Sequence, residues 1–179
     1  MRITPTDCFA IFVDCQERLL PAMDGADALL QNIITLAKGL RIHEVPILVP
    51  QQYSKGLGET VAPLREVLGN FTPFEKTDFS AYSNELAMAA NSLNRRVAIV
   101  CGIEAHVCVL QTVTDLRQAG YQVFLVQDCI GSRKPSDKDT AILRTVAEGA
   151  FITSYESLLF ELTAGKNHPQ FKAISDLVK

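Results

Sequence analysis

The sequence lacks the features that mark several large classes of protein. It has no long run of Lys or Arg and its formal net charge is -3, so nothing in it predicts binding to nucleic acid or to an anionic membrane surface. No apolar stretch approaches the roughly 18 residues that a membrane span needs. The N-terminal residues 1–5 are not typical of a signal peptide. We therefore expect a soluble, cytoplasmic protein with no membrane partner.

The cysteines also lack the spacing of two common site types. No C-x-x-C pair occurs, which disfavours a zinc ribbon. An odd number of cysteines placed largely in apolar runs argues against a disulfide framework. Most of them are expected to be small buried hydrophobic residues. The five are Cys8, Cys15, Cys101, Cys108 and Cys129.

The chain is short and has no internal repeat or linker. Its 179 residues, 47% hydrophobic and 21% charged, are typical of one globular domain, which we assign to residues 1–179. No G-x-G-x-x-G fingerprint follows a predicted strand, so a dinucleotide cofactor is not predicted.

Apolar runs and helical patterns alternate along the chain. Strands are predicted at 8–13, 46–50, 74–77, 96–101, 122–126 and 150–153. Helices are predicted at 26–43, 59–68, 85–93, 107–119, 136–148 and 157–162, with an apolar face in a further C-terminal helix. Unbroken apolar strands joined by helices indicate a parallel sheet covered on both faces. We predict a three-layer α/β/α fold, Rossmann-like, with a mostly parallel sheet of about six strands.

Polar residues stand where these strands end. In an open parallel sheet, ligands bind beyond the carboxyl ends of the strands. Candidates after the successive strands are Asp14 and Gln16, then the stretch from Gln51 to Tyr53, then Lys76, then the stretch from Gly102 to Cys108, and then Asp128.

Three of these residues could form a nucleophile system. Cys108 lies where a strand turns into a helix, whose N-terminus favours a thiolate. Asp14 follows a buried strand, where low polarity would raise its pKa and let it accept the thiol proton. Lys76 would supply a cation beside both. Each also has an ordinary interpretation, because strand-end aspartates often cap loops, most lysines face solvent and most cysteines are only buried.

His106 stands two residues before Cys108 and leaves several roles open. It could pack or hydrogen-bond locally at the start of the helix, contact substrate, or act as a general base. Gln16, Gln51 and Tyr53 are weaker candidates for substrate binding.

Three segments resemble the signature segments of the isochorismatase-like cysteine hydrolases. They are Ile-Phe-Val-Asp-Cys-Gln at 11–16, Phe-Glu-Lys-Thr-Asp-Phe-Ser at 74–80 and Gly-Ile-Glu-Ala-His-Val-Cys-Val at 102–109. The third segment and Asn-His-Pro-Gln-Phe-Lys at 167–172 are most similar to the isochorismatase domain-containing branch of that superfamily. The resemblance runs from the first predicted strand to the last.

The resemblance implies an activity and a site. It implies a hydrolase that acts on a small amide or related C–N bond through a Cys108 thioester, with Asp14 and Lys76 completing a catalytic triad. It also implies a non-proline cis peptide at Ile103–Glu104. That bond would turn the N–H of Glu104 toward the N–H of Cys108 to form an oxyanion hole.

Two departures limit what the resemblance carries. Isochorismatases themselves lack this cysteine, so the superfamily name does not state the activity. Nicotinamidases of the superfamily carry an aspartate–histidine metal site after the second strand, whereas residues 51–58 contain no histidine. We therefore predict no metal and no cofactor, and nicotinamide is disfavoured as substrate.

Other functions remain open at this stage. A non-catalytic interaction or regulatory protein could keep the hydrolase fold. A redox role for Cys108 would use Cys101 as its resolving partner. We expect a small-molecule substrate, no nucleic acid, and a homo-oligomer of two or more subunits. The apolar C-terminal helix face fits either packing within the subunit or a dimer contact.

Overall fold

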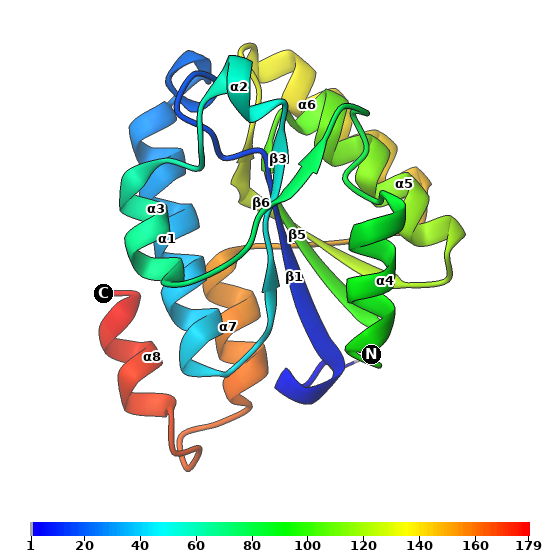
Figure 1. Ribbon diagram of the computed structural model, residues 1–179. Helices are drawn as coiled ribbons and strands as arrows, with labels where there is room; N and C mark the ends of the chain where they lie inside the picture. Colours follow the sequence, from blue (N-terminus) through cyan, green and yellow to red (C-terminus); the bar gives the residue numbers. More distant parts are fainter. Residues whose placement is uncertain (1) are drawn as a thin grey trace.

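The computed structural model describes residues 2–179 as one sheet between two layers of helices (Figure 1). The main sheet is parallel throughout, with the order β2-β1-β5-β6-β7. A separate parallel pair is formed by β3 and β4. The strands are β1 (Cys8–Val13), β2 (Ile47–Leu48), β3 (Pro50–Gln52), β4 (Phe74–Lys76), β5 (Val97–Ile103), β6 (Gln122–Gly131) and β7 (Phe151–Thr153).

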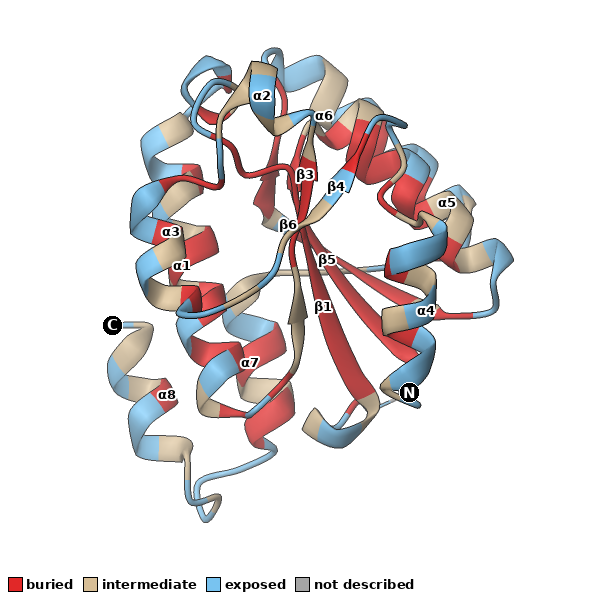
Figure 2. Cartoon of the chain, in the orientation of Figure 1, coloured by how far each residue is buried: buried red, intermediate tan, exposed pale blue. Residues whose placement is uncertain are grey.

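The helices divide between the two faces of the sheet. One hydrophobic cluster joins the sheet to α1, α3, α7 and α8, and the other joins it to α4, α5 and α6. Figure 2 shows the strands buried between these layers. The helices are α1 (Ala26–Ile42), α2 (Ser54–Leu57), α3 (Ala62–Leu68), α4 (Asn84–Ser92), α5 (Leu110–Gln118), α6 (Pro135–Ala147), α7 (Tyr155–Thr163) and α8 (Phe171–Leu177).

The predicted three-layer α/β/α fold is confirmed, but the main sheet has five strands rather than about six. The run at 46–50 does not stay in one sheet. Residues 47–48 pair with β1, and from Pro50 the chain pairs with β4 instead. Pro50 has no N–H, so it cannot donate back to β1 and extend that ladder.

β6 is longer than predicted, because it contains a bulge. Val100 of β5 faces Leu125 of β6, but Gly102, two residues later, faces Ile130. The sequence expectation that this strand ends near Asp128 is therefore wrong. The segment around Asp128 bulges out, and the carboxylate of Asp128 accepts a hydrogen bond from the Tyr155 N–H at the start of α7. The chain then rejoins β5 before α6 begins.

The C-terminal helix packs within the subunit. Ile174 of α8 is fully buried in the cluster formed with α1, α3 and α7. Phe160, Leu177 and Val178 pack against the same cluster. Of the two interpretations of this apolar face, core packing is the one that the structure supports.

Candidate active site

The ends of β1, β4 and β5 bring Asp14, Lys76 and Cys108 together. Asp14 directly follows β1 and Lys76 is the last residue of β4. Cys108 lies in a single π-helical turn, Ala105–Val109, between β5 and α5. Lys76 Nζ is 2.7 Å from Asp14 Oδ2, and Asp14 and Cys108 lie close enough to shift each other's pKa. The three side chains of the expected triad thus form one contiguous group.

A glycine allows this close approach. Gly102 of β5 has φ +116° and lies against the backbone of Val13, just before Asp14. A Cβ at this position would overlap the Val13 carbonyl oxygen, so only glycine fits.

Asp14 is a carboxylate held out of water. Its side chain is fully buried, and neither oxygen is saturated by a hydrogen bond of ordinary geometry. Burial raises the pKa of Asp14 above its usual range, although the charge of Lys76 and hydrogen bonds from Lys76, Cys108 and Gln52 act in the opposite direction. A raised pKa makes this carboxylate a better proton acceptor than an exposed aspartate.

Lys76 is a buried cation surrounded by oxygen atoms. Besides Asp14, its ammonium group donates to Gln52 Oε1 at 2.6 Å and to the carbonyl oxygens of Phe79 at 3.0 Å and Asp78 at 3.2 Å. Three hydrogens shared among these oxygens fix the ammonium in place beside the carboxylate.

The thiol of Cys108 is protonated at rest. Burial raises its pKa to about 12, and the charge and hydrogen bond of Asp14 add to the rise, whereas the Lys76 charge and a hydrogen bond from the backbone of Glu104 lower it. Loss of hydration and the nearby carboxylate thus outweigh Lys76 and the helix N-terminus, the two influences expected from the sequence to favour the thiolate. The proton must leave during the reaction, and Asp14 lies close enough to receive it.

Glu104 lies where the resemblance implies. The peptide bond Ile103–Glu104 is cis, as expected. The Glu104 backbone lies close enough to the Cys108 sulfur to lower the pKa of the thiol, which places Glu104 beside the nucleophile. The side chain of Glu104 turns away and accepts two hydrogen bonds from Arg133.

Gln16 lies close to the site but holds a loop together. Its Nε2 donates to the carbonyl oxygens of Gln52 and Gly58, and its Oε1 accepts from the N–H of Gln52. With both amide hydrogens used inside a buried contact, it has none left for a substrate. The expectation that Gln16 binds substrate is not supported by this geometry.

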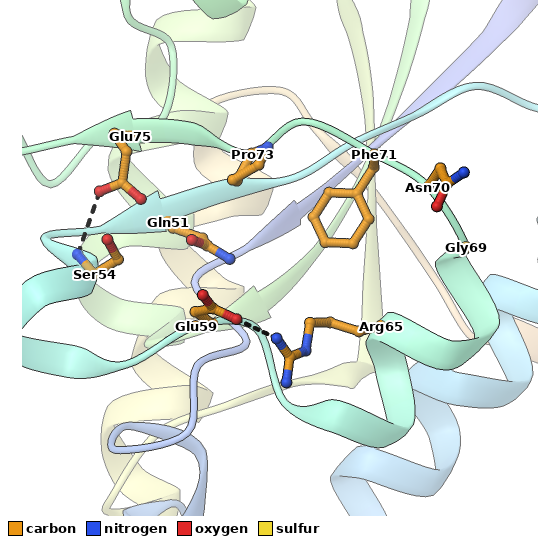
Figure 3. Close-up of a pocket in the computed structure, with 9 residues that line it drawn as sticks. All are labelled: Gln51, Ser54, Glu59, Arg65, Gly69, Asn70, Phe71, Pro73 and Glu75. Carbon is orange, nitrogen blue, oxygen red and sulfur yellow. Dashed lines mark hydrogen bonds and ion pairs between the residues drawn. The ribbon is translucent and has the colours of Figure 1, made fainter.

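Gln51 faces away from Cys108, because successive side chains of a strand point to opposite sides. It contacts Thr60 and lines a pocket of about 370 Å³ on the other side of the β3–β4 pair (Figure 3). That pocket also contains Glu75 and the Glu59–Arg65 ion pair. Asp14 and Lys76 lie beside Cys108 rather than in this pocket, so the expected substrate role of Gln51 is not supported either.

Tyr53 and His106 lie at the edge of the site. The Tyr53 ring is 56% exposed and packs over Gly56. His106 Nδ1 is 2.9 Å from the Ser132 hydroxyl, and its Nε2 is 3.8 Å from an Asp137 carboxylate oxygen. Both rings remain candidates for substrate contact.

The structure gives roles to residues that the sequence analysis did not single out. Within the candidate stretch 51–53, Gln52 rather than Gln51 accepts a hydrogen bond from Lys76. Thr112 of α5 donates to the Cys108 carbonyl oxygen at 2.6 Å and accepts from the Ala81 N–H, which ties the nucleophile turn to the loop after β4. Ser132 and Arg133 follow β6 and hold His106 and Glu104. Strand alternation could have indicated Gln52, whereas the others depend on long-range contacts.

Cys101 is not placed to resolve an oxidised Cys108. It belongs to the hydrophobic cluster on the α1 side of the sheet, whereas Cys108 belongs to the cluster on the α5 side. All five cysteines are free and buried. The sheet separates the two thiols, so the redox interpretation loses the partner that it named.

Comparison with known proteins identifies the family. The isochorismatase domain model matches residues 8–157. The chain belongs to the isochorismatase family. Its relatives include isochorismatase domain-containing protein 1 of Danio rerio, 36% identical over 99% of this chain and 62% of that protein, and isochorismatase domain-containing protein 2 of Homo sapiens, 33% identical over 99% of this chain and 86% of that protein.

The solved structures agree with this assignment. A MAR1 ribonuclease from Caenorhabditis elegans is similar with a TM-score of 0.94 and 35% identity, over 99% of this chain and 92% of that one. The chain spans about three fifths of the length of the isochorismatase domain-containing protein 1 relatives from Danio rerio and Salmo salar. The predicted resemblance to an isochorismatase-like family is therefore confirmed.

Two properties of residues 2–179 bear on partners. None of the helices in this range combines the length and the apolar character that crossing a membrane requires. Within the same range, no three His, Cys, Asp or Glu side chains are grouped so that they could hold a metal ion. The expectation of a metal-free site stays a prediction.

Proposed function

We propose that this chain is a cysteine hydrolase that cleaves a small amide or related C–N bond through a thioester on Cys108. The observation that carries the proposal is the contact between the Cys108 thiol and a buried carboxylate, Asp14, which is itself paired with Lys76. A thiol beside a base of raised pKa is the arrangement that activates a nucleophile.

In the first half of the reaction, the Cys108 sulfur attacks the substrate carbonyl carbon while its proton passes to Asp14. The carbonyl oxygen becomes an oxyanion, which the backbone N–H groups of Glu104 and Cys108 stabilise. When the tetrahedral intermediate collapses, the C–N bond breaks and the leaving nitrogen takes the proton from Asp14. The products of this half are a free amine and an acyl-thioester.

In the second half, water attacks the thioester carbonyl and gives a proton to Asp14. The C–S bond breaks, the acid is released, and the Cys108 sulfur regains its proton from Asp14. Lys76 keeps a positive charge beside the carboxylate throughout, which prevents Asp14 from holding the proton too tightly. No cofactor is required for this sequence.

The test is a screen of small amides, ureides and carbamoyl compounds with the wild type and Cys108→Ala. We expect a burst of amine product from the wild type and an acylated Cys108 detectable by mass spectrometry. Cys129→Ala is the matched control, since it removes a buried thiol from the other face of the sheet. Turnover that survives Cys108→Ala would overturn the proposal, because Cys108 would then not be the nucleophile.

A second candidate is cleavage of RNA, which the name of the C. elegans relative suggests at 35% identity. Against it stand the net charge of -3 and the absence of a basic run, since nucleic-acid binding depends on neutralising phosphates. Incubation of the wild type and of Cys108→Ala with a labelled RNA oligonucleotide distinguishes RNA cleavage from hydrolysis of a small amide. Cleavage by the wild type that Cys108→Ala abolishes would favour this candidate.

Cytoplasmic location and assembly into a homo-oligomer also stay predictions. Cell fractionation tests the first, and sedimentation of the purified chain tests the second. A single species with the mass of one chain, 19.7 kDa, would contradict the expected oligomer.

A further inference from the structure

The bulge in β6 brings a second segment to the nucleophile. Two residues of β5 span the same length as five residues of β6, after which Ile103 and Gly131 pair. The next residues, Ser132 and Arg133, therefore lie beside the turn that carries Glu104, His106 and Cys108. Both make side-chain contacts with that turn.

Arg133 holds Glu104 by two hydrogen bonds to one oxygen. Its backbone N–H donates to Glu104 Oε2 at 3.2 Å and its Nε donates to the same atom at 3.1 Å. Only 14% of the Glu104 side chain is exposed, so this carboxylate depends on Arg133 for its charge partner. Charge-assisted bonds of this kind fix an orientation more firmly than neutral ones.

The held residue is the one whose backbone N–H reaches the nucleophile. The Glu104 backbone lies close enough to the Cys108 sulfur to lower the pKa of the thiol. Its carbonyl oxygen accepts from the N–H groups of Val107 and Val109, so the whole turn is organised around this residue. The second contact, between Ser132 and His106, holds the same turn two residues further along.

We propose that Arg133 is a positioning residue, which acts through Glu104 to aim the Glu104 N–H at the oxyanion. The inference rests on the function proposed above. The pair is a poor candidate for a purely stabilising role, because the Arg133 side chain is 64% exposed and solvent screens its charge. The Arg133–Glu104 pair fixes the geometry of the turn and contributes little to the free energy of unfolding.

The experiment combines Arg133→Met, Glu104→Ala and the double variant, with kcat, KM and thermal melting measured for each. Arg133→Met keeps the length of the side chain but removes Nε. We expect kcat to fall by roughly tenfold or more with KM nearly unchanged, since a misplaced group slows the chemical step. The double variant should be no slower than the slower single variant, because both changes release the same contact. Lys134→Met is the matched control, since Lys134 is also exposed and basic, and it should keep wild-type kcat.

Other outcomes overturn the inference. A raised KM for Arg133→Met, additive with Glu104→Ala, would show that the guanidinium binds substrate directly. Lower melting with an unchanged kcat would make the pair structural. If Arg133→Met does not fold, Arg133→Lys, which keeps the charge without Nε, takes its place under the same criteria. Wild-type kcat in the Arg133 variant with an inactive Cys108→Ala refutes this inference alone, whereas an active Cys108→Ala refutes the proposed function and this inference with it.

Discussion

Lys76 Nζ lies 2.7 Å from Asp14 Oδ2, and the two side chains are 2% and 0% exposed. A buried ion pair is costly to form and still more costly to break, because removal of one partner leaves the other charge without compensation. Burial raises the pKa of Asp14, and the charge of Lys76 is the largest influence that lowers it. The pair therefore links the stability of the fold to the protonation state of the site.

Removal of the cation should expose that link. In Lys76→Met, the free energy of unfolding at pH 7 is expected to fall by about 3 kcal/mol or more. The pKa of Asp14 should rise further, because its main lowering influence is lost. As pH falls through that raised pKa, Asp14 becomes protonated in Lys76→Met and its uncompensated charge disappears. The difference in free energy of unfolding between the variant and the wild type should therefore become smaller in acid. Urea unfolding at several pH values measures this, with exposed Lys55→Met as control; a deficit that does not depend on pH would contradict the expectation.

Asp14→Asn separates base catalysis from structure. Turnover should fall by roughly a hundredfold or more, the usual scale of general acid–base catalysis. Melting at pH 7 should fall less than in Lys76→Met, because the Lys76 ammonium keeps three other oxygen acceptors.

The pH dependence of Asp14→Asn has a definite sign. The folded pKa of Asp14 is raised, so the wild type binds this proton more tightly when folded. Its stability relative to Asp14→Asn should therefore increase as pH falls through the folded pKa toward the ordinary value of 3.8.

A folded Asp14→Asn with near wild-type turnover would exclude Asp14 as the base and leave His106 as the next candidate.

Adjacent glutamines of β3 should behave differently. Gln52→Leu removes an acceptor of the Lys76 ammonium and is expected to lower kcat. Gln51→Leu removes a buried contact with Thr60 on the opposite side, so it should lower the melting temperature with little effect on kcat. Equal losses of kcat in both variants would show that the strand does not separate the two environments.

Cys108 should be alkylated by iodoacetamide faster than the other cysteines. It is 7% exposed, whereas each of the other four is no more than 1% exposed. Its rate should nevertheless be well below that of a thiolate, because its pKa is about 12 and the proton must first pass to Asp14. Mass-spectrometric mapping over time gives the order, and modification of Cys108 last would exclude it as the nucleophile.

Activity should survive prolonged EDTA treatment. No cluster of three or more His, Cys, Asp or Glu side chains placed to hold a metal ion occurs among residues 2–179, and the proposed reaction uses only side chains and backbone N–H groups. The control is a zinc-dependent amidase inactivated under the same conditions. Loss of turnover that zinc or iron restores would reveal a metal site.

Local sequence determined much of this protein. Continuous apolar runs placed β1 at residues 8–13 and the core of β5 almost to the residue, because strands buried on both faces need apolar side chains throughout. The strand-end rule then indicated Asp14, Lys76 and Cys108. The family resemblance added the cis peptide at Ile103–Glu104, which the structure contains.

Tertiary structure alone decided the rest. The sequence could not show that β3 leaves the main sheet and turns Gln52 toward Lys76 and Gln51 away from it, since a shift of one residue reverses the faces of a strand. Nor could it show that β6 bulges and returns to bring Arg133 against Glu104, 29 residues away in the chain. Nor could it show how strongly burial and Asp14 raise the pKa of Cys108, because only the fold brings these influences to the thiol.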